Sequence, residues 1–308
     1  MRVAVVGATG FVGSYVVDLL LEQGHEVNQL VRPGSEHNAR HADSTRIVFG
    51  SIDSTSNLNE LVAGCDAVIY SVGILRESPR KGVTFENTQF DGVARTLDAA
   101  VANDVGRFLL LSANGVKNSG TRYQETKKRA EELVLASNLD ATIFRPSVIF
   151  GDPRGRMEFA TQLFRDMVQK PIPAVNFFKG WIPGRGDILM SPVHVSDVAG
   201  TVVGALSNPQ TTGRTYELGG PETLSWSAMI RRIAETTGRR KWIIPVPIGL
   251  MKIAATFFDF LPFFPVTRDQ LTMLQEDNTV NSEAVGSLTG TEPVAFSIEQ
   301  LDYLNANS

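Results

Sequence analysis

The N-terminal run VAVVGATGFVGSYVVDLLL limits the possible folds of this chain more than any other segment does. A short apolar strand leads into Gly7, Gly10 and Gly13, and an amphipathic helix follows. In a nucleotide-binding turn the first glycine permits the tight bend, the second lets the backbone approach a pyrophosphate, and the third lets the helix pack near the strand. Free N–H groups and the dipole at the start of such a helix favour phosphate.

The run therefore predicts a turn that binds a dinucleotide, because strand, glycines and helix occur in the required order. The alternative is a tight turn of the same shape that has lost its ligand. The candidate cofactor-binding residues of this turn are Gly7, Thr9, Gly10, Phe11, Val12 and Gly13.

The first 150 residues alternate short β-branched runs with longer helical periods, which is the pattern of βαβ units. The strands are continuous apolar runs, as expected when helices cover both faces of a parallel sheet. We expect an α/β fold with a doubly wound parallel Rossmann sheet, and helices that start near Phe11, Leu58, Thr84 and Tyr123. The predicted strands are Arg2–Val6, Glu26–Val31, Arg46–Phe49, Ala67–Ser71, Phe108–Leu111 and Thr142–Pro146.

The end of the second predicted strand indicates which dinucleotide binds. It reads NQLVRPGS, with Arg32 where an NAD-preferring fold has Asp or Glu for the ribose 2′-hydroxyl. A guanidinium suits a 2′-phosphate, because it forms bidentate, charge-assisted hydrogen bonds. The sequence therefore favours NADP(H) over NAD(H). The alternative is that Arg32 is a solvated loop charge.

Two further strand ends contribute candidate cofactor-binding residues. FGSIDS follows the third strand and places Ile52 and Asp53 near the expected adenine edge. YSVG follows the fourth strand, and Gly73 lets the backbone pass close to the cofactor, next to Ser71 and Val72.

Residues 151–308 have a different character. After FGDPRG the strand–helix rhythm loosens, and glycine and proline become frequent through QKPIPAVNFFKGWIPGRGD. We expect residues 1–150 to form an NADP(H)-binding domain and residues 151–308 to form a smaller mixed α/β substrate-side region packed on it. Helices are predicted at Ser225–Thr237 and Ile248–Leu261.

A tyrosine and a lysine share one face of the helix predicted after the fifth strand. Tyr123 and Lys127 lie on the same side as Ala130 and Val134, opposite Lys128. A lysine chosen only for solubility would sit with Lys128. The alternative is a helical pair of Lys127 with Glu131, although the lysine-first order is the less favourable one.

These residues could carry out proton transfer. Acid–base work near neutrality requires the phenol pKa of about 10 to fall by up to about 3 units, and an ammonium and an oxidised nicotinamide could lower it. Ser112, at the end of the fifth strand, could hold a substrate carbonyl oxygen. Ser112, Tyr123 and Lys127 are therefore the candidate catalytic residues, with hydride passing between nicotinamide and carbonyl carbon.

Composition excludes several classes of function. The net charge is −4 and no basic stripe occurs, so nucleic acid is not an expected partner. The single cysteine, Cys65, permits no internal disulfide and no cysteine zinc site, and the four histidines are scattered, so we predict no metal. MRVAVVGATG does not resemble a signal peptide, which favours the cytoplasm. The apolar run 247–266 is broken by Lys252, Asp259 and two prolines, so it is a poor transmembrane candidate.

Two other segments allow more than one interpretation. In SPVHVSDVAG, His194 and Asp197 suggest a metal site or acid–base chemistry, but we favour capping of the following helix by Ser196 or Asp197. FFKGWIPGRGDILM, with Phe177, Phe178, Trp181 and Arg185, could be a substrate lid or an aromatic-anchored surface loop. With the apolar run it suggests an apolar small-molecule substrate, or contact with a membrane surface. The alternative is core packing, which alone would explain many of these aromatic residues.

Several motifs together resemble the short-chain dehydrogenase/reductase superfamily, in its extended and atypical branch. They are GATGFVG, SANGV, YQETK and FRPSVIFGDP. More narrowly, the runs GILRESPRKGVTFENTQFDGVARTLDAA, SPVHVSDVA and YELGGPE resemble relatives of the nucleotide-binding accessory subunit of respiratory complex I. The eleven positions from Ser112 to Tyr123 are fewer than extended members usually have.

The resemblance implies roles for particular residues. The glycines of the turn and Arg32 would contact NADP(H), Tyr123 and Lys127 would border the nicotinamide ribose, and Pro146 and Val148 would lie near the nicotinamide. It leaves two functions open: an NADP(H)-dependent oxidoreductase acting on a carbonyl or quinone-like substrate, or a non-catalytic NADP(H)-binding subunit or assembly factor linked to complex I or ubiquinone metabolism. Contact with a respiratory complex or the inner face of a membrane follows from the second.

Overall fold

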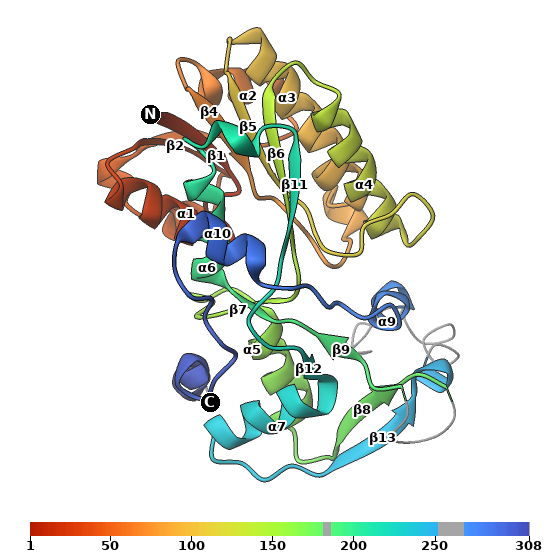
Figure 1. Cartoon of the computed structure of the whole chain (residues 1–308). Coiled ribbons are helices and arrows are strands. Elements are labelled where there is room, and N and C mark those ends of the chain that lie inside the picture. The colour runs from red at the N-terminus through yellow and green to blue at the C-terminus, as the bar shows by residue number, and fades with distance from the viewer. Residues whose placement is uncertain (181–185, 252–267, 308) are drawn as a thin grey trace. The chain divides into compact units, whose positions relative to one another are not determined.

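The computed structural model describes residues 1–180, 186–251 and 268–307, which fall into two compact units (Figure 1). Unit 1 comprises Met1–Pro146, Val195–Glu217 and Glu283–Thr291. Unit 2 comprises Ser147–His194, Leu218–Ser282 and Glu292–Ser308. Each unit has its own core.

Unit 1 is built on a seven-stranded sheet with the order β11-β6-β5-β4-β1-β2-β3. The pairings from β6 across to β3 are all parallel. The strand order reverses between β1 and β4, and in open α/β sheets ligands bind outside the carboxyl ends of the strands at such a point. The doubly wound parallel sheet is therefore confirmed. Its strands are β1 Arg2–Val6, β2 Glu26–Val31, β3 Arg46–Phe49, β4 Ala67–Tyr70, β5 Arg107–Leu111, β6 Asp140–Pro146 and β11 Arg214–Leu218.

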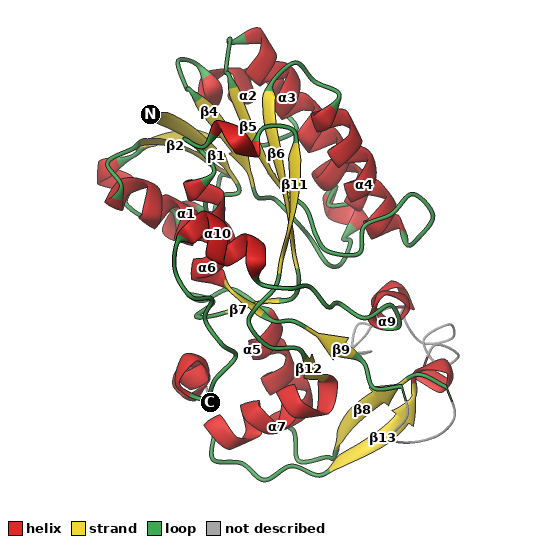
Figure 2. Cartoon of the chain, in the orientation of Figure 1, coloured by secondary structure: helices red, strands yellow, loops and turns green. Residues whose placement is uncertain are grey.

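Helices cover both faces of this sheet (Figure 2). On one face, α2 (Thr55–Val62), α3 (Gly92–Ala102) and α4 (Arg122–Leu135) share an apolar cluster with Ala4 and Val6 of β1. Elsewhere in the unit, α1 (Phe11–Glu22) packs against α6 (Val195–Gly204), which contacts α10 (Glu283–Thr289). Because both faces are covered, the strands are apolar on both sides, as their sequences predict.

One predicted helix start differs from the structure. The helix expected near Leu58 begins earlier, at Thr55, because the Ser54 hydroxyl caps it by accepting from the Asn57 N–H at 3.4 Å. The helix expected near Thr84 is confirmed: a π-helical turn, Glu86–Asp91, lies at that position and continues directly into α3.

The predicted domain boundary at residue 150 divides the chain differently from the structure. The chain leaves unit 1 after Pro146 and returns to it twice, through 195–217 and 283–291. Buried Arg107 of β5 is one reason: its guanidinium donates to Thr142 Oγ1 at 2.7 Å, to Ala205 O at 2.9 Å and to Thr211 Oγ1 at 2.5 Å. Two of these acceptors belong to the segment 195–217. The buried Arg107 cation is therefore fully hydrogen-bonded only when this segment packs against β5.

Unit 2 has a smaller core of aromatic and aliphatic side chains. The described residues of unit 2 form three two-stranded sheets: β7 with β10, β9 with β12, and β8 with β13. The predicted helix at Ser225–Thr237 is confirmed as α7 (Trp226–Thr236), capped by the Ser225 hydroxyl. Most of the predicted helix Ile248–Leu261 lies outside the described residues. The other elements are β7 Ile149–Phe150, α5 Phe159–Leu163, β8 Ala174–Phe178, β9 Leu189–Met190, β10 Val193–His194, β12 Leu224–Ser225, β13 Ile243–Pro247 and α9 Arg268–Leu274.

The aromatic segment expected to be a lid or surface loop is partly core. Phe177 and Phe178 are each 1% exposed, and Phe177 contacts Trp226 at a ring-centroid distance of 5.7 Å. Core packing therefore explains these two rings. Trp181 and Arg185 lie outside the described residues. No helix in the described ranges is both long and apolar enough to cross a membrane.

Candidate functional site

The predicted cofactor residues of unit 1 follow the carboxyl ends of its parallel strands. Because these strands run in the same direction, their carboxyl ends lie along one edge of the sheet. In spatial order, the edge carries Pro146 at the end of β6, Ser112 after β5, Ser71, Val72 and Gly73 after β4, Gly7 after β1, Arg32 after β2, and Ile52 and Asp53 after β3. Val148 belongs to unit 2.

The glycine turn between β1 and α1 has the geometry that its sequence implies. Gly7 has φ +93°, a conformation that side chains disfavour, and its carbonyl accepts from the Gly10 N–H at 2.9 Å. A Cβ on Gly13 would lie 2.1 Å from the Gly7 carbonyl oxygen. The turn therefore tolerates no side chain at Gly13, and it brings the start of α1, with Thr9, Phe11 and Val12, next to the end of β1.

The ends of β1 and β4 touch beside this turn. The Ser71 hydroxyl donates to the Val6 carbonyl at 3.1 Å. A Cβ on Gly7 would lie 2.8 Å from Ser71 Oγ and 3.1 Å from the Val72 N atom. Gly7, Ser71 and Val72 thus meet at the reversal of strand order, where a pyrophosphate would lie.

Arg32 and Asp53 differ in whether their charged groups already have partners within the protein. Arg32 is exposed, and its guanidinium has no ion-pair partner within the described ranges. Asp53 accepts from the Arg95 guanidinium at 3.2 Å and from the Ser51 hydroxyl at 2.9 Å, and Arg95 also donates to the Ile52 carbonyl at 2.8 Å. Arg32 is therefore free to meet an anion, while Asp53 is already engaged.

A capping box fixes the start of α4. The Thr121 hydroxyl accepts from the Gln124 N–H, and the Gln124 side chain accepts from the Thr121 N–H at 2.9 Å. Tyr123 consequently lies in the first turn and Lys127 one turn later, and both are buried. The Lys127 Nζ atom lies 5.8 Å from the centre of the Tyr123 ring.

Lys127 reaches the carboxyl edge of the sheet. Its Nζ donates to the Leu111 carbonyl at 3.2 Å, and a Cβ on Gly73 would lie 3.8 Å from the same atom. Burial lowers the pKa of Lys127 to about 8, although the Glu131 carboxylate opposes this shift. The proposed helical pair with Glu131 does not form in the structure, because Glu131 instead accepts two hydrogen bonds from the Arg145 guanidinium, at 2.8 and 2.5 Å.

The phenol of Tyr123 is not activated by the protein. Burial raises the pKa of Tyr123 well above its usual value, and Lys127 does not offset this shift. Its ring packs edge-to-face on Phe85 at 5.6 Å, and its hydroxyl has no protein hydrogen-bond partner in the described part of the chain. At neutral pH the group is thus a protonated acid, and a downward shift would require another positive charge close by.

The buried hydroxyl of Ser112 has no hydrogen-bond partner among the described residues. Its Oγ is one of three buried side-chain polar atoms without a hydrogen-bond partner among the described residues, although its N–H donates to the Phe144 carbonyl at 2.7 Å. Buried hydroxyls are normally paired, because an unmet hydrogen bond costs about 1–3 kcal/mol. An unpaired hydroxyl at this edge is available to a ligand.

The residues that hold α4 in place are not among those that the sequence predicted. Buried Gln89 donates to the Ile74 carbonyl at 2.9 Å and accepts from the Thr126 hydroxyl at 3.1 Å, joining the segment after β4 to α4. Phe85 supplies the ring beneath Tyr123. Neither has a sequence signal, because each acts through contacts distant in the chain.

The region around His194 is structural in character. Its ring packs edge-to-face on Phe150 at 5.0 Å, and burial lowers the pKa of His194 to about 4. Helix α6 begins at Val195, so Ser196 and Asp197 lie inside its first turn and not at the capping position before it. The ranges that the structure covers contain no group of three or more His, Cys, Asp or Glu residues that could hold a metal.

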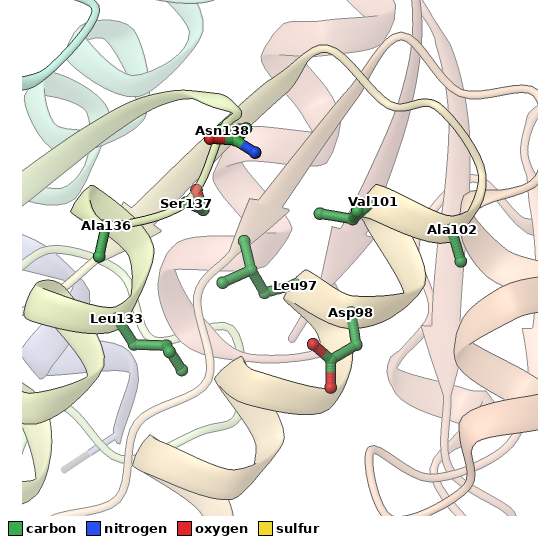
Figure 3. A pocket seen from close by; sticks show the side chains of 8 residues that line it. All are labelled: Leu97, Asp98, Val101, Ala102, Leu133, Ala136, Ser137 and Asn138. Atoms are coloured by element: carbon green, nitrogen blue, oxygen red, sulfur yellow. The ribbon is translucent and has the colours of Figure 1, made fainter.

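A hollow of about 400 Å³ lies apart from this edge (Figure 3). It is lined by residues near the C-terminal ends of α3 and α4, including Leu97, Asp98, Val101, Leu133 and Asn138. These ends lie toward the opposite edge of the sheet, because each helix runs antiparallel to the strands it covers. The hollow is therefore not part of the candidate nucleotide site.

Replacing Lys127 by methionine is expected to stabilise the nucleotide-free chain by about 1–3 kcal/mol at pH 7. The fall of the Lys127 pKa from 10.5 to about 8 corresponds to a cost of roughly 3 kcal/mol, offset in part by the bond to Leu111. Below pH 8 folded and unfolded chains both carry the charge, so the cost is complete. Between about 8 and 10.5 the unfolded chain binds more protons, so wild-type stability rises with pH.

Urea unfolding at pH 7 and at pH 10 measures both effects for the Lys127→Met variant. Lys128→Met is the matched control, since Lys128 is partly exposed and pairs with Glu132 at 3.5 Å. The control should gain no stability. A loss of stability in Lys127→Met at pH 7 would show that the ammonium is stabilising as it stands.

Comparison with known proteins supports the assignment of unit 1 as a nucleotide-binding fold. The model of the NAD(P)H-binding family matches residues 7–170, which is more than half of the chain. The NADH-ubiquinone oxidoreductase 40 kDa subunit of Neurospora crassa, described as mitochondrial, is 28% identical over 91% of this chain and 72% of its own length. A ceramide reductase of Caulobacter vibrioides is 26% identical over 80% of this chain and 73% of its own length.

The fold is shared more widely than the sequence. The crystal structure of gox2253 superposes with a TM-score of 0.79 at 22% identity, covering 99% of this chain and 97% of that one. The resemblance to extended short-chain dehydrogenase/reductase proteins and to relatives of the complex I subunit is thereby confirmed. This chain belongs to the NAD(P)H-binding family.

Proposed function

We propose that this protein is an NADP(H)-dependent oxidoreductase of the short-chain dehydrogenase/reductase type, acting on a carbonyl or quinone-like substrate. The observation that carries the proposal is the unpaired, buried Ser112 hydroxyl at the carboxyl end of β5, on the edge that Lys127 also reaches. A site with an unmet hydrogen bond, an unpaired phenol and a buried ammonium is costly to maintain without a ligand.

Each side chain then has a distinct role. NADP(H), when bound, supplies or accepts the hydride. The Ser112 hydroxyl donates a hydrogen bond to the substrate oxygen, and the Tyr123 phenol gives that oxygen its proton during reduction. Lys127 places a positive charge beside the nicotinamide ribose. The Tyr123 phenol is protonated at neutral pH, as reduction requires, but burial raises its pKa and makes it a weaker acid. Proton transfer would therefore need the Lys127 charge and the bound nucleotide to lower that pKa.

The second candidate is a non-catalytic NADP(H)-binding subunit or assembly factor associated with a respiratory complex. The raised pKa of Tyr123 supports it, because the protein does nothing to activate the phenol as a base. The similarity to the Neurospora crassa subunit supports it as well. Under this proposal the protein acts in the cytoplasm or at the inner face of a membrane, and the nucleotide stabilises a surface that the complex recognises.

Turnover by the purified protein separates the two functions. NADPH consumption is followed with a panel of aldehydes, ketones and quinones, and nucleotide affinity is measured in parallel by calorimetry. Turnover that depends on Ser112 and Tyr123 supports the oxidoreductase. Tight nucleotide binding without turnover of any acceptor supports the accessory role.

Arg32 is proposed to select NADP(H). Arg32→Ala is expected to weaken NADPH binding about 10–100-fold, the loss of one or two charge-assisted hydrogen bonds, and to leave NADH binding unchanged. Isothermal titration with both nucleotides measures the ratio. Arg46→Ala is a suitable control, because Arg46 is exposed on β3 and pairs with Glu60 at 3.5 Å. Equal losses for NADPH and NADH would refute selection by Arg32.

A further inference from the structure

Unit 2 exposes apolar side chains beside cationic ones. We call this surface the Trp242 patch: Ile172, Arg239, Arg240, Trp242 and Ile244. Trp242 is 82% exposed, Ile172 is 60% exposed and Ile244 is 50% exposed, and both arginines are exposed. No other tryptophan in the described part of the chain is exposed, since Trp226 is buried. Such grouping of apolar residues on a surface usually marks an interaction site.

Local structure holds the patch in a fixed shape. β13 pairs in parallel with β8, with Ile243 opposite Ala174 and Ile244 opposite Val175. The Ala174 N–H donates to the Trp242 carbonyl at 2.8 Å, so Trp242, just before β13, lies near Ile172, two residues before β8. Side chains alternate along a strand, so Trp242 and Ile244 project from the face opposite Ile243, which packs on the core.

Lys241 ties the patch to the preceding helical segment. Its Nζ donates to the Val168 carbonyl at 3.1 Å and also to the Lys170 carbonyl. The Lys241 ammonium is therefore already hydrogen-bonded within the protein. The positive charge that is available at the surface comes from Arg239 and Arg240. Neither Arg239 nor Arg240 has a carboxylate partner within the described ranges, and the Arg239 guanidinium lies 5.8 Å from the Phe164 ring. On a chain of net charge −4, this excess of positive charge is local.

We propose that the Trp242 patch binds the surface of a membrane containing anionic phospholipid. Tryptophan is enriched at membrane–water interfaces, because its ring is apolar and its N–H is polar. Arginines near such a surface each contribute about 1 kcal/mol by attraction to anionic headgroups. Trp242, Ile172 and Ile244 enter the headgroup region, and Arg239 and Arg240 contact phosphate and carboxylate groups.

A protein strand is a less suitable occupant of this site. β13 contains Pro245 and Pro247, which have no N–H groups, so its edge cannot donate a regular ladder of hydrogen bonds. The patch also differs from the segment that the sequence suggested for membrane contact, where Phe177 and Phe178 are buried. The proposal does not depend on whether the protein turns over a substrate.

Vesicle co-sedimentation of the full chain tests the proposal. Wild-type protein is mixed with vesicles of phosphatidylcholine alone, or with about 30 mol% phosphatidylserine, at roughly 0.1 M and 0.5 M salt. We expect binding to the anionic vesicles only, and weaker binding at the higher salt. The double variant Arg239→Ser with Arg240→Ser is expected to lose about 30-fold in partition, and Trp242→Ala about 10-fold.

The matched control is Arg80→Ser with Lys81→Ser, an exposed pair in unit 1 that makes the same change in net charge. This control should bind vesicles as the wild type does. Thermal unfolding checks that every variant is folded, which is expected because the substituted side chains are exposed. Wild-type binding that ignores phosphatidylserine would overturn the proposal. Patch variants that bind vesicles as well as the wild type would also overturn it, as would a control that loses as much vesicle binding as the patch variants do. The patch would then be assigned to a protein partner.

Discussion

Replacement of Gly13 by alanine is expected to weaken NADP(H) binding by at least about 100-fold and to destabilise the fold. The added Cβ would lie 2.1 Å from the Gly7 carbonyl oxygen and 2.8 Å from the Gly7 carbonyl carbon. Both atoms are backbone, and Gly7 is already held at φ +93° with its carbonyl bonded to Gly10. The only relief is to move α1 away from β1, which carries the phosphate-facing N–H groups away from the ligand.

Nucleotide titration and urea unfolding measure the two losses separately. Gly106→Ala is the control, because a Cβ there meets nothing within 4 Å and Gly106 has an ordinary φ. That variant should bind and unfold like the wild type. Normal nucleotide affinity in Gly13→Ala would mean that the turn does not hold the pyrophosphate. The alternative interpretation, a tight turn that has lost its ligand, would then be favoured.

Tyr123→Phe is expected to lower NADPH-dependent turnover about 1,000-fold, the effect of removing a general acid. Nucleotide affinity and stability should change little. The ring and its edge-to-face contact with Phe85 at 5.6 Å are kept, and the lost hydroxyl has no protein partner in the described part of the chain. The wild-type phenol is protonated through the neutral range, as any phenol with an unlowered pKa is, and it therefore carries the proton that reduction needs.

Steady-state kinetics and calorimetry on the same preparations separate the chemical role of Tyr123 from binding. Tyr70→Phe is an informative comparison: its hydroxyl donates to the Thr88 carbonyl at 2.6 Å, so its loss should cost stability and not turnover. If Tyr123→Phe retained full turnover with every acceptor that the wild type reduces, the proton would come from elsewhere and the oxidoreductase proposal would lose its acid. The accessory function would then be favoured.

The sequence predicted the local elements of unit 1 well because their signals are local. β1, β2 and β3 have the predicted ends, and the glycine spacing alone indicated where α1 meets β1. The helical phase of Tyr123 and Lys127 also placed both side chains on the inner face of α4, where they are buried. In each case, residues a few positions apart decide the outcome.

Other predictions needed contacts that the sequence does not display. The boundary at residue 150 missed the return of 195–217 and 283–291 to unit 1, which depends on bonds such as that from Arg107 to Ala205. Phe177 and Phe178 were candidates for a lid or a surface loop, with core packing as the alternative, and they pack in the core of unit 2. An apolar run has the same sequence signal whether it becomes core, lid or membrane contact.

The sequence by itself determined a parallel α/β sheet, a glycine turn suited to pyrophosphate, and which polar residues follow the carboxyl ends of the predicted strands. Only the tertiary structure decided which of those residues are unpaired. It left the Ser112 hydroxyl without a hydrogen-bond partner among the described residues, engaged Asp53 with Arg95, paired Glu131 with Arg145 and not with Lys127, and exposed Trp242. The reason is physical: periodicity fixes the face of an element on which a side chain lies, whereas burial and pKa depend on what distant parts of the chain place against that face.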